Sequence, residues 1–155
     1  MAGTVDQRLN ELGITLPEPA APAANYIPYV ISGNLVFVSG QITMKDGEIK
    51  YVGKVGDDFS VDEGYQAARI CAINLLAQVK IACGGDLDRL KRVVKLGGFV
   101  NCTADFGDQP KVINGASDLM VEVLGDAGKH ARFAVGAPSL PLGIAVEVDG
   151  IFEID

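Results

Sequence analysis

The sequence predicts an α+β fold in which two helices cover one face of a mixed β-sheet. Apolar β-type runs open the main body at 29–31 and 35–39 and close it at 132–136 and 144–154. Between them lie two stretches with helical spacing of apolar residues, at 61–83 and 111–124, separated by a β-type run at 93–101. The order of the main elements is therefore β-β-α-β-α-β-β.

The N-terminal segment, residues 1–24, differs in composition from the rest of the chain, which we assign to a single domain over residues 25–155. Thr4 is a candidate N-cap of a short helix over residues 4–12, which should end at Gly13. Three prolines among alanines then predict an extended arm. An arm of this composition has no core of its own, so we interpret it as a strap across the body rather than a separate module.

A β-hairpin is expected at the start of the domain. Gly33-Asn34 can supply the positive φ angles of a tight turn between the apolar runs 29–31 and 35–39. The tripeptide Lys45-Asp46-Gly47 indicates a second turn, and a short strand should follow around residues 49–52.

Both helices have boundary signals. Ser60 and Glu63 form a capping-box pattern, and the helix that follows them should stop at Gly84-Gly85. The second helix is expected to follow Pro110. Gly97-Gly98 interrupts the β-type run between the helices, which indicates a bulge or the close approach of another backbone.

The sheet face away from the helices needs a cover of its own. The last strand alternates Glu147 and Asp149 with apolar residues, and the hairpin is apolar on both faces. A closed homo-oligomer would bury these surfaces, and a cyclic trimer is one arrangement that leaves none of them uncovered.

Charge and cysteine content argue against a nucleic-acid binder, a zinc protein and a disulfide-stabilised protein. The 155 residues carry a net charge of -7, and their basic residues are mostly scattered, whereas nucleic-acid binders usually have a basic face. Three cysteines without a C-x-x-C pair and a single histidine provide too few ligands for a zinc site or a disulfide framework. We therefore expect no metal and no cofactor, and a cytoplasmic protein with neither a leader nor a membrane span.

Arg132 is the first candidate site residue. It lies in the β-type run Ala131–Val135, where its charge should be partly buried. Because a guanidinium does not lose its proton in practice, it requires an anion there. That anion is either a protein carboxylate such as Glu147, or a ligand carboxylate or phosphate held bidentately.

Four further positions could serve a ligand. Glu147 could position or deprotonate a water molecule, or pair with Arg132 or a lysine. Tyr26 could form an aromatic wall or an anchoring plug. Ser39 and Gly40 end a strand, where donors could converge on a ligand, or where ordinary turn chemistry would use them.

The remaining polar and nucleophilic residues are interpreted as structural. Asn114 interrupts the apolar side of the second helix, and satisfying neighbouring backbone groups is favoured there over ligand contact. His130 is expected to be exposed, and Cys71 and Cys83 to be small core residues. The sequence contains no G-x-S-x-G, P-loop or dinucleotide-binding motif.

Two motifs together resemble the reactive intermediate deaminase (Rid) family, also called the YjgF-like or endoribonuclease L-PSP family. Arg132, Leu140-Pro141 and Val146-Glu147-Val148 match the family's tail with the spacing intact. The segment Gly33–Gln41 matches its first hairpin. The sequence departs from the family's pattern at Phe133-Ala134, where small polar residues are common, so the chain resembles a divergent branch.

The resemblance implies chorismate-mutase-like β-β-α-β-α-β subunits in a homotrimer, with clefts between neighbouring subunits. In active members, the arginine matched by Arg132 grips the carboxylate of an imino or enamino acid, and the glutamate matched by Glu147 positions the attacking water. Tyr26 matches an aromatic residue of the cleft, Ser39 and Gly40 match residues near the ligand, and Asn114 matches a family asparagine on the second helix.

Three functions are compatible with this resemblance. The first is hydrolytic deamination of small 2-imino acids to 2-oxo acids and ammonia. The second is a non-catalytic trimer that binds small carboxylates or partner proteins. A ribonuclease is disfavoured by the acidic charge and by the lack of a histidine pair.

Overall fold

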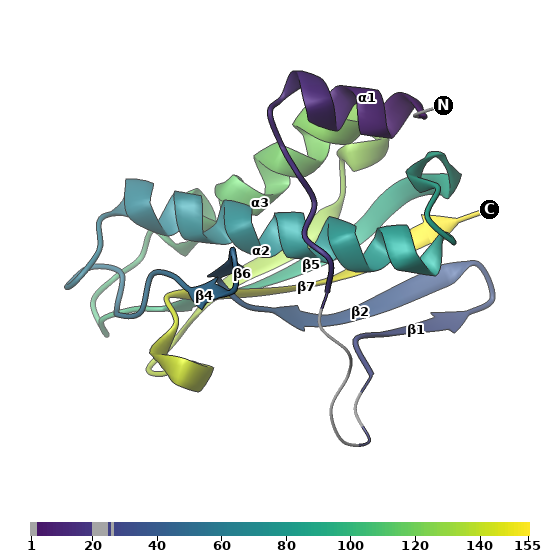
Figure 1. The fold of residues 1–155 in the computed structure, drawn as a ribbon. Coiled ribbons are helices and arrows are strands. Elements are labelled where there is room, and N and C mark those ends of the chain that lie inside the picture. Colours follow the sequence, from purple (N-terminus) through teal and green to yellow (C-terminus); the bar gives the residue numbers. More distant parts are fainter. Residues whose placement is uncertain (1–2, 20–24, 26) are drawn as a thin grey trace.

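The computed structural model of the chain describes residues 3–19, 25 and 27–155. A five-stranded mixed sheet lies under helices α2 and α3, which confirms the predicted α+β class (Figure 1). The two helices are α2 (Val61–Ala82) and α3 (Gln109–Leu124), and the strands are β1 (Tyr29–Ser32), β2 (Leu35–Gln41), β5 (Leu90–Asn101), β6 (Ala131–Ala137) and β7 (Val146–Ile154).

Strand β7 lies in the middle of the sheet, whose order is β1-β2-β7-β5-β6. It pairs antiparallel with β2 on one side and with β5 on the other, whereas β5 and β6 are parallel. The register of β2 against β7 shifts between Val38 and Gln41, so the backbone is irregular at the end of the predicted hairpin. A small separate hairpin follows, with strands β3 (Met44–Lys45) and β4 (Glu48–Ile49).

The two consecutive glycines of β5 accommodate side chains, which corrects the sequence interpretation. The register shifts of β5 against β7 fall between Leu90 and Lys95, not at the glycines. A Cβ on Gly97 would lie 2.3 Å from an oxygen of Asp149, and one on Gly98 would lie 2.6 Å from Ile113 of α3. No bulge and no second backbone is therefore needed to explain the glycines.

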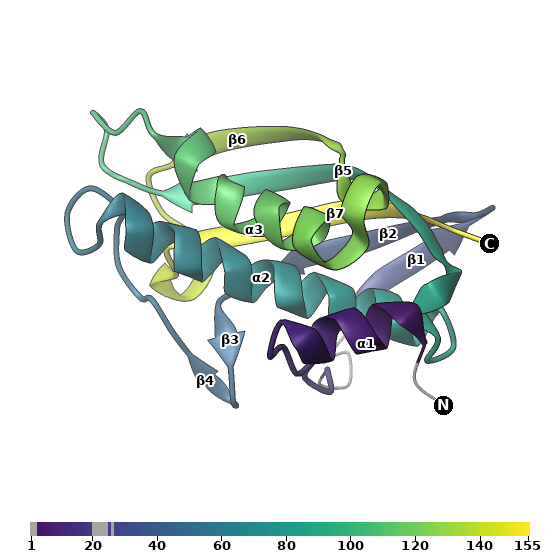
Figure 2. The same cartoon turned by 90° about the horizontal axis from the view of Figure 1, so that it is seen from above.

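The helices form where their sequence signals place them. Ser60 and Glu63 make the predicted capping box, with hydrogen bonds of 3.2 and 3.1 Å. Helix α3 packs closely on α2 at Gly115, where a Cβ would lie 2.0 Å from the carbonyl oxygen of Tyr65. Figure 2 shows both helices side by side above the strands.

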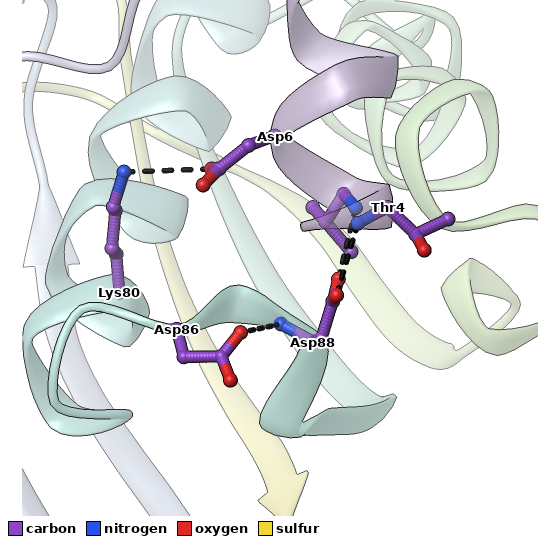
Figure 3. A network of polar contacts seen from close by, with 6 residues as sticks. Thr4, Asp6, Lys80, Asp86 and Asp88 are labelled. Atoms are coloured by element: carbon purple, nitrogen blue, oxygen red, sulfur yellow. Dashed lines mark hydrogen bonds and ion pairs between the residues drawn. The ribbon is translucent and has the colours of Figure 1, made fainter. Parts of the chain in front are cut away.

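The N-terminal helix α1 (Thr4–Glu11) is held by residues far away in the sequence. Thr4 is its first residue and not its cap, because the carboxylate of Asp88 accepts hydrogen bonds from the N–H groups of Thr4 and Val5, both at 2.9 Å (Figure 3). Asp6 also pairs with Lys80 of α2 at 3.4 Å. Asp88 belongs to the short 3-10 helix η1 (Leu87–Arg89).

The start of the arm also contributes to the core. Leu9 of α1 and Ile14 beyond it are buried in the same apolar cluster as the sheet and the helices. In the predicted arm, Pro17 and Pro19 lie in a segment without regular secondary structure, and Pro22 lies outside the described residues. None of the described helices is both long and apolar enough to cross a membrane.

The sheet face away from α2 and α3, which we call the outer face, carries exposed apolar side chains. Val30, Phe37 and Val135 are 50%, 42% and 42% exposed. Phe99 and Phe133 lie on the same face and form a T-shaped pair with ring centroids 5.3 Å apart. A surface of this kind is typical of an interface.

Candidate functional site

The strongest candidate residues lie on opposite faces of the sheet. Arg132 belongs to the edge strand β6, and its side chain contacts α3, so it lies on the helix face of the sheet. Glu147 pairs with Phe99, and paired residues on neighbouring strands point to the same face. Because Phe99 packs on Phe133 of the outer face, Glu147 points there as well. The sheet therefore divides the predicted site into two half-sites within one chain.

The first half-site is built around the guanidinium of Arg132. Its Nη1 donates to Ser117 Oγ at 3.0 Å, and its Nη2 donates to the carbonyl oxygen of Pro110 at 3.2 Å. Both partners belong to α3. Among the described residues, no carboxylate forms an ion pair with Arg132, so the alternative of an Arg132–Glu147 pair within one chain is wrong.

Asn114 belongs to the same half-site by its position on α3. Pro110, Asn114 and Ser117 are spaced by four and three residues, which places them on one face of the helix. Arg132 contacts the first and the last of them, so Asn114 lies between its two anchors. Within the described part of the chain, the Asn114 carboxamide makes no hydrogen bond, contrary to the favoured interpretation that it satisfies backbone groups.

Two residues of this half-site were missed at the sequence level. His130 is half-buried and not exposed: its Nε2 lies 2.8 Å from Ser117 Oγ, and its Nδ1 lies 2.6 Å from the carbonyl oxygen of Gly128. Ser117 is thus shared between His130 and Arg132. Its spacing from Pro110 and Asn114 was a usable signal, and so was the i, i+2 spacing of His130 and Arg132 at the start of a strand.

The second half-site lies on the outer face around Glu147. A Cβ on Gly40 would lie 2.9 Å from Cδ and 3.1 Å from Oε1 of Glu147, so the bare backbone of Gly40 makes room for the carboxylate. Burial, and then the charge of Asp149, raise the pKa of Glu147 above its ordinary value. A carboxylate with a raised pKa is a stronger proton acceptor, as a general base requires.

The other predicted residues contribute less to either half-site. The hydroxyl of Ser39 donates to the carbonyl oxygen of Ile27 at 3.1 Å, and its N–H donates to that of Pro28 at 2.8 Å. Ser39 lies within β2, and these two bonds tie β2 to the segment that precedes β1. Tyr26 lies outside the described residues.

The cysteines are unpaired and buried. Cys71 and Cys83 pack in the core, as predicted, and burial raises the pKa of both thiols. A raised pKa leaves little thiolate at neutral pH, so neither is prepared as a nucleophile. Among the described residues, no group of three His, Cys, Asp or Glu side chains could hold a metal ion.

Comparison with known proteins places the chain among relatives of similar length. It is 49% identical over 155 residues to Protein TCP17 of Trypanosoma cruzi, covering 99% of this chain and 96% of that protein. It superposes on the crystal structure of Atu1372 from Agrobacterium tumefaciens, a protein of unknown function, with a TM-score of 0.92 and 53% identity over 98% of this chain and 93% of that one.

A more distant similar structure is that of a protein named RidA. RidA from the Antarctic bacterium Psychrobacter sp. PAMC 21119 is 29% identical, with a TM-score of 0.56, over 86% of this chain and 94% of that one. The family model described as "YjgF/chorismate mutase-like, putative endoribonuclease" matches residues 6–152. The resemblance seen in the sequence is thereby confirmed: the chain belongs to the YjgF/chorismate mutase-like family.

Proposed function

We propose that this protein hydrolyses small 2-imino acids to 2-oxo acids and ammonia in clefts between the copies of a homotrimer. The observation that carries the proposal is the division of the site: Arg132 and Glu147 lie on opposite faces of one sheet. A ligand can contact both only if the Arg132 half-site of one copy meets the Glu147 half-site of another. The exposed apolar outer face provides the surface that such a contact would bury.

The half-sites divide the chemistry between them. The guanidinium of Arg132 has five N–H donors, of which two are used by Ser117 and Pro110, so others remain for a bidentate contact with the substrate carboxylate. Glu147 accepts a proton from the water that attacks the imine carbon. The attack forms a carbinolamine, and the protonated Glu147 gives its proton to the nitrogen. The C–N bond then breaks and releases ammonia, while the hydroxyl loses its proton and the carbon becomes the carbonyl carbon of a 2-oxo acid.

The imine is reactive enough that the protein needs to supply few catalytic groups. An iminium carbon is electrophilic, so a fixed cation and one proton acceptor suffice to orient the substrate and the water. The raised pKa of Glu147 supports the role of proton acceptor. The relative named RidA supports the reaction class, because the resemblance of the two motifs points to the same family of deaminases.

The direct test generates 2-iminopropanoate in situ and follows pyruvate formation against the spontaneous rate. Wild type is expected to accelerate the reaction, and Arg132→Ala and Glu147→Gln to lose the acceleration. No acceleration by wild type for several imino acids would overturn the proposal. Melting temperature and oligomeric state, measured on each variant, separate a lost function from a lost fold.

Co-expression of the two inactive variants tests the shared cleft. If each cleft takes Arg132 from one copy and Glu147 from the next, random mixed trimers regain about one quarter of the wild-type activity. Co-expression of the double variant with wild type is the control, and it should also leave about one quarter. Half of the activity in this control, with none in the first mixture, would place both residues in one chain's cleft.

The second candidate is a non-catalytic carboxylate-binding trimer. It is favoured by the Arg132 half-site alone, whose guanidinium has fixed partners and no carboxylate partner among the described residues. Calorimetry with pyruvate distinguishes the two functions: binding that depends on Arg132, with no imine hydrolysis, supports the second. Cleavage of RNA by the purified protein would support the endoribonuclease name instead.

A further inference from the structure

Ser117 and His130 form a hydrogen-bonded chain that ends on Arg132. The chain runs from Arg132 Nη1 to Ser117 Oγ at 3.0 Å, from Ser117 to His130 Nε2 at 2.8 Å, and from His130 Nδ1 to the carbonyl oxygen of Gly128 at 2.6 Å. Ser117 lies on α3, Gly128 ends the 3-10 turn that follows it, and His130 and Arg132 lie on either side of Ala131, the first residue of β6.

The chain has only one direction when the imidazole is neutral. A carbonyl oxygen can only accept, so His130 Nδ1 carries the proton and donates to Gly128. Nε2 is then the acceptor, so the Ser117 hydroxyl donates its hydrogen bond to it. Because its one O–H group donates to His130, Ser117 Oγ can only accept a hydrogen bond from Arg132, and the guanidinium donates it. Each group therefore fixes the next one.

The Gly128 end of this hydrogen-bonded chain is held firmly by packing. Gly128 is buried in the 3-10 helix η2 (Gly125–Gly128), and a Cβ there would lie 2.2 Å from the carbonyl oxygen of Met120 on α3. This packing holds the Gly128 carbonyl against the helix that also carries Ser117. The second anchor of Arg132, the Pro110 carbonyl, lies on the first turn of the same helix.

We infer that Ser117 and His130 are positioning residues, which hold the Arg132 guanidinium so that its remaining N–H groups face a ligand carboxylate. The inference rests on the proposed carboxylate-binding role of Arg132. A long side chain with fixed anchors loses less conformational freedom on binding than a free one, so positioning acts on affinity. It leaves the proton transfer at Glu147, on the other face, untouched.

The ring of His130 reports on the chain directly. It is the single histidine of the sequence, so one imidazole appears in a long-range ¹H–¹⁵N spectrum. At a pH where the ring is neutral, the expected tautomer has a protonated Nδ1 and an unprotonated Nε2. Ser117→Ala should shift the Nε2 resonance, and Lys129→Ala, which removes an exposed neighbour, should not. A ring protonated at Nε2 would overturn the inference.

The mobility of Arg132 gives a second readout that needs no ligand. ¹⁵N relaxation of its Nε is expected to show an ordered side chain in wild type and a more mobile one in Ser117→Ala. Ser117→Thr keeps the hydroxyl and should restore order. Equal mobility in wild type and Ser117→Ala, with both proteins folded, would contradict a positioning role.

Binding and kinetics then connect the chain to the proposed function. With pyruvate as the probe, Ser117→Ala and His130→Phe should raise Kd by about three- to tenfold, as the loss of one hydrogen bond predicts. KM for the imino acid should rise with it, while kcat stays near the wild-type value and Ser117→Thr stays close to wild type. An unchanged Kd in both variants would overturn the inference.

The two proposals fail in different ways. If wild type neither binds pyruvate nor hydrolyses imines, the proposed function fails, whereas the tautomer and the order of Arg132 still decide whether the chain positions the guanidinium. If wild type is active and Ser117→Ala is indistinguishable from it in Kd, KM and Arg132 order, only the positioning inference fails.

Discussion

The side chain of Glu147 occupies the space that a Cβ on Gly40 would fill, with Cδ 2.9 Å and Cγ 3.1 Å from that position. Gly40 lies at the register shift between β2 and β7, so the irregular backbone and the missing side chain occur at the same place. This contact connects the first hairpin to the last strand, the two segments whose motifs identify the family.

Gly40→Ala should therefore lower activity more than stability. Its Cβ meets the end of a flexible side chain, which can turn away at little cost, so we expect a change of about 0.5–1 kcal/mol in the free energy of unfolding. The displaced carboxylate should lower kcat/KM at least about tenfold. Gly107→Ala is the matched control, because a Cβ there meets no atom within 4 Å. Equal activities of the two variants would count against the role of Glu147.

Asp149→Asn should move the acid limb of the pH–activity profile to lower pH. Burial and the charge of Asp149 raise the pKa of Glu147, and the carboxylate must be ionised to accept a proton. Activity is therefore lost as the pH falls through this raised pKa, and removal of the Asp149 charge lowers the pKa. Glu153→Gln, farther along the same strand, should leave the limb in place. The measurement is kcat/KM as a function of pH, from about pH 4, near the ordinary pKa of a carboxyl group, to about pH 8.

Asp88→Ala should loosen α1 from the body. The hydrogen bonds from Val5 and Thr4 lower the pKa of Asp88, so its ionised form is the one that holds the helix. This stabilisation is complete above the pKa of the unfolded chain, and it is lost as the pH falls through the lowered pKa of the folded state. Amide hydrogen exchange should speed up in α1 at neutral pH, with a smaller difference from wild type in acid.

Asp88→Asn provides the matched comparison for this cap. The amide keeps one acceptor oxygen and loses the charge, so the exchange rates of α1 should fall between those of wild type and Asp88→Ala. Unchanged protection of α1 in Asp88→Ala would show that Leu9 and the Asp6–Lys80 pair suffice to hold the helix.

Gly115→Ala should destabilise the protein by about 2–4 kcal/mol, because its Cβ would lie 2.0 Å from a backbone oxygen of α2 that cannot turn aside. The helices would have to separate. Urea unfolding measures the loss, with Gly107→Ala again as the control. A cost as small as that of Gly40→Ala would mean that the α2–α3 contact adapts.

Local signals in the sequence predicted the local structure well. The turn at Gly33-Asn34, the Ser60–Glu63 capping box and the stop of α2 before Gly84 are confirmed, because each depends on residues a few positions apart. Within the turn, Gly33 has the expected positive φ, whereas Asn34 does not. The prediction of Thr4 as the cap was wrong, because the N–H groups at the start of α1 donate to Asp88, which lies 84 residues away in the sequence. No short-range pattern contains that information.

The sequence named candidate site residues but did not predict how they are arranged. The spacing of Arg132 and Glu147 identified both residues, but the face to which each points follows from the pairing of β6 with β5 and of β5 with β7. A shift of one residue in either pairing would reverse it. His130 was predicted to be exposed for a similar reason, since its partner Ser117 lies on another element.

The central position of β7 has a consequence for biosynthesis. Its residues, 146–154, leave the ribosome after every other strand, yet β2 and β5 are joined only through it. Until β7 emerges, the β1–β2 hairpin and the β5–α3–β6 unit remain separate and have unpaired edges, so the sheet closes only once β7 has been made. A chain that stalls before Val146 would expose both edges to aggregation.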